Sequence, residues 1–175
     1  LMTAIIGMTI EEVEKEINLI PKSEICEIAN DNTIGQVVVS GTKKGIEILN
    51  ENLKKKKKRG IILPVSAPFH CSLMKSASLS MKEKINNTNF IEPTQNIISN
   101  VTAKVEKDVN NIKSLLFEQI TSRVRWRESV NFMINEKITD FIEIGPGKVL
   151  TGLVKKINKT VNIKNINSLK DIKND

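Results

Sequence analysis

The sequence predicts an α/β protein whose first 65 residues form a ferredoxin-like lobe. Apolar residues in this part follow strand-like and helix-like patterns in turn, in the order strand, helix, strand, strand, helix, strand. After residue 65 the pattern changes to helices separated by short apolar strands. With 175 residues, of which 39% are hydrophobic and 27% charged, the chain is long enough to bury a core.

The elements of the first lobe follow from local signals. Thr9 and Glu12 have the spacing of a capping box, and Pro21 ends the helix that follows. The Asn-rich stretch 30–35 is expected to be a turn between two strands. We expect strands at 2–7, 25–29, 36–40 and 61–65, a helix from about residue 10 to 20, and a second helix marked by Ile46, Leu49 and Leu53.

Beyond residue 65 the pattern alternates between helices and strands without a repeat. We expect residues 140–144 (DFIEI), in which three of the five side chains are apolar, to form a strand of the buried parallel kind. A Gly-Pro-Gly turn at 145–147 then leads into a helix. We expect helices at 72–86, 112–120, 126–134 and 148–157, a strand at 95–100, and a polar segment from 158 onward with at most one edge strand.

Composition and charge make several classes of function less favoured. The net charge of +7 invites a nucleic-acid interpretation, but the excess is concentrated in the run 54–59, and no aromatic residue interleaves with it for base stacking. A solvated helix C-terminus explains this run better. No apolar run is long enough to span a membrane. The two cysteines, Cys26 and Cys71, form no metal-binding pattern and predict no disulfide, which favours a reducing cytoplasm.

His70 is the only histidine of the chain and the first candidate for chemistry. It lies between an apolar strand and a helix, and Pro64 and Pro68 stiffen the backbone that precedes it. A titratable ring that the scaffold holds in place suits a general base. The alternative is a histidine that only satisfies a hydrogen bond at this junction.

Five segments, in order along the chain, resemble the motifs of one enzyme family. They are Asn30–Gly41 (NDNTIGQVVVSG), Pro64–Met74 (PVSAPFHCSLM), Ile98–Ala103 (ISNVTA), Gln119–Trp126 (QITSRVRW) and Glu143–Leu153 (EIGPGKVLTGL). The family is that of the malonyl-CoA:acyl carrier protein transacylases of fatty acid synthesis. Because the segments are linked and cover nearly the whole chain, chance similarity is a poor explanation.

The resemblance implies both a fold and a reaction. Residues 1–65 would be a ferredoxin-like small subdomain, 66–158 the C-terminal part of an α/β-hydrolase-like acyltransferase domain, and 159–175 a polar tail. Such an enzyme is an acyl-carrier-protein S-malonyltransferase. It moves malonyl from malonyl-CoA to the phosphopantetheine thiol of acyl carrier protein by a serine–histidine mechanism, without a metal or cofactor.

The resemblance also assigns roles to five residues. His70 would be the catalytic base, and the main-chain carbonyl of Gln119 would accept a hydrogen bond from its ring. Phe69 would narrow the substrate site and favour malonyl over methylmalonyl, although a core aromatic is an equal alternative. Asn30 and Asn32 would lie near the active-site cleft, although a plain Asx-turn explains them nearly as well.

One departure from the family bears directly on activity. The 175 residues contain no Gly-x-Ser-x-Gly motif, and Ser66 and Ser72 lack the strand-to-helix context of such a nucleophile. In the family that motif lies upstream, as do the arginine that pairs with the malonyl carboxylate and a Gly-Gln-Gly-Ser loop. We therefore expect a C-terminal part that is inactive alone and pairs with an N-terminal half. The alternative function is a non-catalytic module that binds acyl carrier protein or another acidic partner through its basic surface.

Two further sequence patterns are weaker indications of a functional site. Gly145-Pro146-Gly147-Lys148 fails the spacing of a phosphate-binding loop, since Val149 stands where a serine or threonine is needed. We expect instead a turn with a free helix N-terminus and weak anion affinity at most. Cys71 lies next to His70, but adjacency alone does not make a catalytic pair, because consecutive side chains point in different directions.

Overall fold

The computed structural model describes residues 1–172, which divide into two compact units, Leu1–Ser129 and a second unit that begins at Val130. The subdomain boundaries at 65 and 158 remain predictions. The elements are β1 (Met2–Ile6), α1 (Ile10–Ile17), β2 (Cys26–Thr33), β3 (Gln36–Gly41), α2 (Lys43–Lys55), β4 (Arg59–Ile62), the 3₁₀ helix η1 (Ser72–Met74), α3 (Lys75–Asn87), β5 (Ile97–Ile98), β6 (Val105–Glu106), α4 (Val109–Glu118), α5 (Trp126–Asn135), β7 (Asp140–Ile144), α6 (Val149–Ile157), β8 (Asn162–Ile166) and α7 (Leu169–Ile172).

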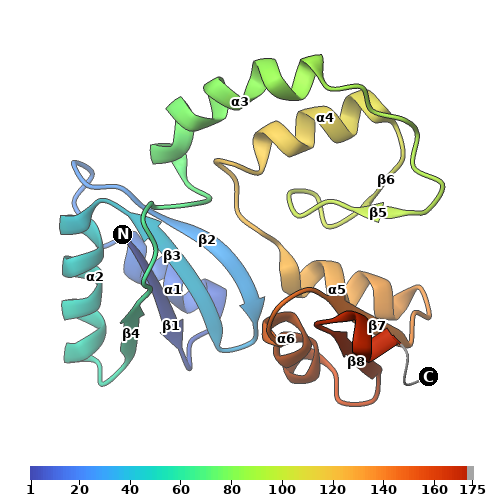
Figure 1. Cartoon of the computed structure of the whole chain (residues 1–175). Coiled ribbons are helices and arrows are strands. Elements are labelled where there is room, and N and C mark those ends of the chain that lie inside the picture. Colours follow the sequence, from blue (N-terminus) through green and yellow to red (C-terminus); the bar gives the residue numbers. More distant parts are fainter. Residues whose placement is uncertain (173–175) are drawn as a thin grey trace. The chain divides into compact units, whose positions relative to one another are not determined.

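The first unit is built on an antiparallel sheet of four strands in the order β2-β3-β1-β4 (Figure 1). α1 begins with the predicted capping box, in which Thr9 accepts from the Glu12 N–H and the Glu12 carboxylate accepts from the Thr9 N–H. The apolar faces of α1 and α2 pack on one face of the sheet. This core consists of Ile5, Met8, Val13, Ile20, Cys26, Val37, Val39, Ile46, Leu49 and Leu53.

The Asn-rich stretch 30–35 is mostly strand, so the prediction of a turn there was wrong. β2 runs to Thr33, and the hairpin to β3 has only Ile34 and Gly35 in its loop, with Gly35 at a φ of 82°. Pairing with β3 extends the strand because backbone groups of this stretch gain hydrogen-bond partners, which outweighs the local preference of asparagine for turns. Two register shifts between Ile28 and Thr33 mark β-bulges in this part of β2.

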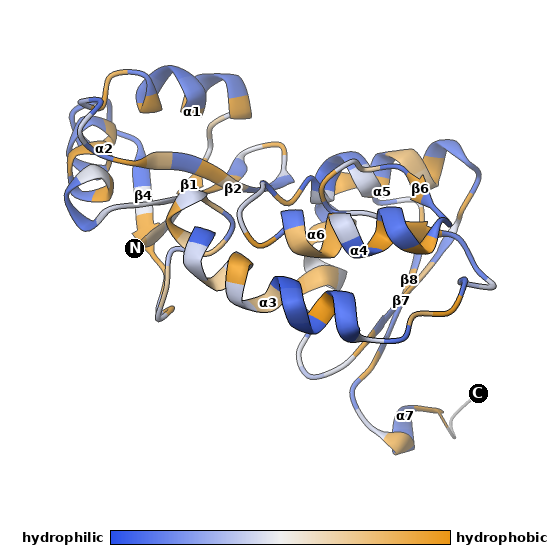
Figure 2. Ribbon diagram, turned by 90° about the horizontal axis from the view of Figure 1, so that it is seen from above, coloured by the Kyte–Doolittle hydropathy of each residue, from blue (hydrophilic) through white to orange (hydrophobic). Residues whose placement is uncertain are grey.

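After β4 the chain forms two helices and a small hairpin. The predicted helix 72–86 is present as η1 and α3, in which Leu79 and Met81 are exposed and Ser78 is the buried position. Figure 2 shows hydrophilic and hydrophobic positions mixed along α3. The predicted strand 95–100 is only β5, which pairs antiparallel with β6. α3 packs against α4.

In the second unit β7 pairs with β8 in parallel, as its apolar pattern suggested, but β7 is not buried. Ile142 is 58% exposed and Ile144 is 80% exposed. Phe141 and Glu143, on the alternate positions, are half-buried. A parallel strand is normally covered on both faces, so this apolar face has no cover among the residues described. α7, near the C-terminus, was not predicted.

No helix within residues 1–172 is both long and apolar enough to cross a membrane.

Candidate active site around His70

His70 lies in a tight turn between β4 and η1. Its φ is 59°, in the left-handed region that residues with a Cβ rarely adopt. Pro64 and Pro68 restrict the backbone that leads into this turn. Cys71, directly after the histidine, is fully buried. Such a conformation persists only where the surroundings hold it, and it is found most often at functional sites.

The imidazole ring has one clear partner. His70 Nδ1 lies 2.8 Å from the carbonyl oxygen of Gln119. A carbonyl can only accept, so Nδ1 carries the proton in this hydrogen bond, and the neutral ring presents Nε2 as an acceptor. Nε2 has no hydrogen-bond partner among residues 1–172, and the residue is half-buried. This is the arrangement that a general base needs.

The position of the Gln119 carbonyl follows from the end of α4. Gln119 is the C-cap residue of α4, and its N–H donates to Leu115 O at 2.9 Å. The last carbonyls of a helix have no partner within it, and they carry a partial negative charge. The His70 N–H therefore satisfies one of these carbonyls.

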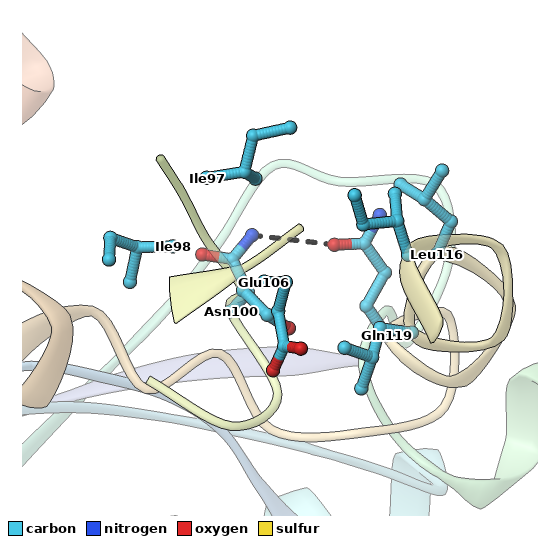
Figure 3. A pocket seen from close by; sticks show the side chains of 9 residues that line it. Ile97, Ile98, Asn100, Glu106, Leu116 and Gln119 are labelled. Carbon is cyan, nitrogen blue, oxygen red and sulfur yellow. Dashed lines mark hydrogen bonds between the residues drawn. The ribbon is translucent and has the colours of Figure 1, made fainter. Parts of the chain in front are cut away.

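The side chain of Gln119 lines a cavity of about 210 Å³ (Figure 3). Its Oε1 lies 3.4 Å from Nδ2 of Asn100, which is a weak hydrogen bond. The rest of the lining is mainly apolar and comes from β5, β6 and α4. The lining residues are Ile97, Ile98, Ser99, Asn100, Glu106, Ile112, Leu115, Leu116 and Gln119. The histidine itself does not line this cavity.

Phe69 precedes the histidine and is 39% exposed. Its carbonyl oxygen accepts from Oγ of Ser40 at 2.5 Å. The side chain is therefore not a buried core aromatic within the residues described. Its proposed influence on acyl selectivity stays a prediction.

Asn30 and Asn32 lie on β2, so an Asx-turn does not explain them. Both are half-buried, and neither forms a hydrogen bond to His70 in the described part of the chain. The backbone around Asn30 pairs with Val124, where Asp31 N donates to Val124 O (2.9 Å) and Val124 N donates to Ala29 O (2.8 Å). This pairing ties the segment that follows Gln119 to β2.

A buried ion pair beside this segment was missed by sequence reasoning. Asp31 is 1% exposed and accepts three hydrogen bonds from Arg127, at 2.8 to 3.1 Å. These hydrogen bonds raise the pKa of Arg127. In the same segment, hydrogen bonds from Arg125 hold the pKa of Glu128 below its ordinary value. The only signal in the sequence was a lone acid between two asparagines, which does not reveal burial.

The N-terminus of α6 is not free, so the expectation of weak anion affinity there was wrong. The Glu143 carboxylate accepts from the Leu150 N–H at 3.0 Å and from the Thr151 N–H at 2.8 Å. The chain's own carboxylate thus occupies the place where an anion would bind. Within residues 1–172 there is also no group of three or more histidine, cysteine, aspartate or glutamate side chains that could hold a metal ion.

Cys71 does not form a thiolate–imidazole pair with its neighbour. Its Sγ donates to Pro68 O at 3.0 Å, and burial raises its pKa. Burial also raises the pKa of Cys26 to about 11. Because the thiolate is the reactive form, a pKa of about 11 leaves roughly two hundredfold less thiolate at pH 8 than an ordinary cysteine with a pKa of about 8.5.

We therefore expect neither thiol of the folded chain to react with iodoacetamide at pH 8 on the timescale of a free thiol. Mass spectrometry of the alkylated chain measures this directly, and the same chain in concentrated urea, where both thiols should react, is the control. Rapid modification of Cys71 in the folded chain would contradict this reading of the site.

Comparisons with known proteins agree with the motifs on which the resemblance was based. No family model matches the chain. The malonyl CoA-acyl carrier protein transacylase of Bacillus subtilis (strain 168) is 44% identical over 160 residues, which are 90% of this chain and 50% of that protein. The crystal structure of an acyl-carrier-protein S-malonyltransferase from Bartonella henselae superposes with a TM-score of 0.93 at 39% identity, covering 98% of this chain and 55% of that one.

A third match is a malonyl-transacylase in complex with a type II PKS acyl-carrier protein. It has a TM-score of 0.92 and 32% identity and covers 98% of this chain and 56% of that one. The fold and these matches place the chain in the same class as these proteins, which are named as transacylases and an S-malonyltransferase. The chain belongs to the malonyl CoA-acyl carrier protein transacylase family and is consistent with its C-terminal part. It spans about half the length of the relatives that it matches.

Proposed function

We propose that this chain supplies the general base of an acyltransferase that moves a malonyl group from malonyl-CoA to the phosphopantetheine thiol of acyl carrier protein. The observation that carries the proposal is the 2.8 Å hydrogen bond between His70 Nδ1 and the Gln119 carbonyl, which leaves Nε2 as the acceptor. The names of the relatives supply the substrates. His70 and Gln119 are thus our proposed catalytic pair.

The reaction runs through a serine ester. Nε2 of His70 takes the proton of a serine hydroxyl as its oxygen attacks the malonyl thioester carbon, and it then returns the proton to the departing thiol of coenzyme A. In the second half Nε2 takes the proton of the carrier thiol as its sulfur attacks the ester, and the proton then passes to the departing serine oxygen. No cofactor or metal enters either step.

The attacking serine is expected to come from polypeptide outside these 175 residues, which contain no Gly-x-Ser-x-Gly motif. The two serines near the histidine are poor candidates. Ser72 Oγ donates to the Glu27 carboxylate, and Ser66 lies exposed in a bend without a following helix. We therefore propose that the chain is inactive alone and works with a segment that corresponds to the N-terminal half of its relatives.

The exposed side chains of β7 supply a place for that segment. Ile142 and Ile144 form an apolar face on a parallel strand, and Val149 of α6 is 71% exposed. Large exposed apolar side chains in a row are typical of a surface that another polypeptide covers. The relatives are about twice as long as the matched region, so they have the length to supply such a cover.

The finer structural assignments are also proposals. We propose that residues 1–65 are a ferredoxin-like small subdomain, which the βαββαβ element order and the antiparallel sheet order β2-β3-β1-β4 support. Phe69, Asn30 and Asn32 are proposed to line the acyl site, with Phe69 favouring malonyl. Two free cysteines suit a reducing compartment, and we propose the cytoplasm.

Reconstitution tests the proposal. The chain is co-expressed with the N-terminal half of the Bacillus subtilis relative, which is the half that the family places upstream of the matched region. We expect the two polypeptides to co-purify and to transfer radiolabelled malonyl from malonyl-CoA to acyl carrier protein, while each alone transfers none. A stable complex that leaves acyl carrier protein unlabelled would contradict the proposed reaction.

The same assay also tests the alternative function, in which the chain is a non-catalytic module that binds an acidic partner. The exposed run Lys54–Arg59 favours this alternative, because within the described residues only Lys56 and Lys58 of the run make side-chain contacts, to Glu16 and to the Gly7 carbonyl. Binding of acyl carrier protein without acyl transfer in the reconstituted complex would support that alternative.

A further inference from the structure

The turn that carries His70 is held on both sides by side chains of the neighbouring sheet. On one side, Ser40 of β3 donates its hydroxyl to the Phe69 carbonyl at 2.5 Å. On the other side, the carboxylate of Glu27 on β2 accepts from the Ser72 N–H at 2.8 Å and from the Ser72 hydroxyl at 2.5 Å. The residues that receive these contacts stand one before and two after the histidine.

The two contacts hold the turn in different ways. Ser40 is completely buried, so its hydroxyl would lose a partner that water cannot replace if the Phe69 carbonyl moved. The Glu27 carboxylate makes charge-assisted hydrogen bonds to two donors of one residue, which fixes direction as well as distance. The sheet therefore holds the Phe69 carbonyl and the Ser72 N–H in place.

The left-handed backbone conformation of His70 explains why these two contacts matter for the imidazole ring. A φ of 59° is disfavoured for a residue with a Cβ, so a turn released at either end would relax toward a negative φ. That relaxation would swing the Cα–Cβ bond and carry the ring away from the Gln119 carbonyl. The hydrogen bond that selects the Nδ1–H form of the ring depends on the turn staying as it is.

We propose that Ser40 and Glu27 are positioning residues, which keep His70 in its left-handed conformation so that Nδ1–H faces Gln119 and Nε2 stays open as the acceptor. They act through the backbone of the turn and touch no reacting atom. The catalytic meaning of this positioning rests on the function proposed above. The positioning itself is a property of this chain and is measured without any acyl transfer.

The test is the tautomer of the imidazole, read from the ¹⁵N chemical shifts of the ring in the ¹⁵N-labelled full chain. His70 is the only histidine, so its two ring nitrogens are the only imidazole signals. We expect the Nδ1–H form to dominate in the unsubstituted chain at alkaline pH. Ser40→Ala and Glu27→Ala should each lower its ratio to the Nε2–H form about fivefold, the factor expected for one hydrogen bond lost.

Two substitutions serve as matched controls. Thr3→Val removes a buried hydroxyl from β1, where Oγ1 donates to Asn50. Glu24→Ala removes a carboxylate that also accepts from a hydroxyl, that of Thr42. Both should leave the tautomer ratio unchanged even if they lower stability to a similar degree.

An unchanged ratio in Ser40→Ala and Glu27→Ala, with the backbone spectrum intact, would overturn the proposal. So would an equal change in the controls. If Ser40→Ala failed to fold, Glu27→Ala would decide, because Glu27 is only half-buried and its loss leaves no cavity in the core. In the reconstituted enzyme the same pair should lower kcat with little effect on KM. If the reconstituted enzyme transferred no malonyl, that result would contradict the proposed function and not the positioning of His70 by Ser40 and Glu27.

Discussion

His70→Ala should lower the kcat of malonyl transfer by the reconstituted enzyme about 10²- to 10⁴-fold. The reason is the pairing of Nδ1 with the Gln119 carbonyl, which leaves Nε2 as the open acceptor of the imidazole. No other histidine exists in the chain to replace it. Binding of malonyl-CoA should change little, because alanine removes a proton acceptor and not a substrate contact. Initial rates of labelled malonyl transfer measure the effect.

Two further variants serve as comparisons for His70→Ala. Ser66→Ala changes an exposed residue of the same segment and should leave the rate unchanged. Gln119→Ala should cost only a few-fold, because the acceptor for His70 is a main-chain carbonyl that alanine also has. Retention of more than a tenth of the activity in His70→Ala would show that another group acts as the base.

Arg127→Ala should lower the free energy of unfolding by about 3–5 kcal/mol. The substitution leaves the Asp31 carboxylate, which is 1% exposed, without the guanidinium that satisfies it. An uncompensated buried charge is far more costly than the loss of an exposed ion pair. Urea denaturation of the chain, followed by circular dichroism, measures the change.

The matched control is Arg123→Ala. Arg123 also pairs with an acid, Glu128 at 3.5 Å, but both side chains are about one-third exposed, so we expect a loss of less than about 1 kcal/mol. The double variant Asp31→Asn/Arg127→Ala should recover part of the stability, since the buried charge is gone. If Arg127→Ala cost no more than Arg123→Ala, the ion pair would contribute little to the fold.

Local signals predicted the order of the elements up to β4 because those signals act over a few residues. The capping box of Thr9 and Glu12 starts α1 as expected, and the order of strands and helices up to β4 is the predicted one. The errors came where pairing between strands, or cover by other segments, decides. The Asn-rich stretch became strand through its pairing with β3, and β7 kept its parallel partner but not its predicted burial.

The candidate active site likewise combines residues that the sequence pointed to with residues that only the structure revealed. His70 was singled out by its prolines and its position between a strand and a helix, and Gln119 by resemblance to a known family. Nothing local pointed to Ser40, which lies 29 residues from its partner, or to Glu27, which lies 45 residues from Ser72. The partners Asp31 and Arg127 are 96 residues apart. Isolated serines and acids are common, and their sequence context does not state what they touch.

By itself the amino-acid sequence determined which ring can carry a proton, which family the chain resembles, and the order of its helices and strands up to β4. These depend on residue type and on short-range backbone preferences. Only the tertiary structure decided that the ring is locked through Nδ1, that the turn around it is left-handed, and that sheet side chains hold that turn. Such features arise from hydrogen bonds that form when distant segments meet, and a buried polar group can find its partner only in the folded chain.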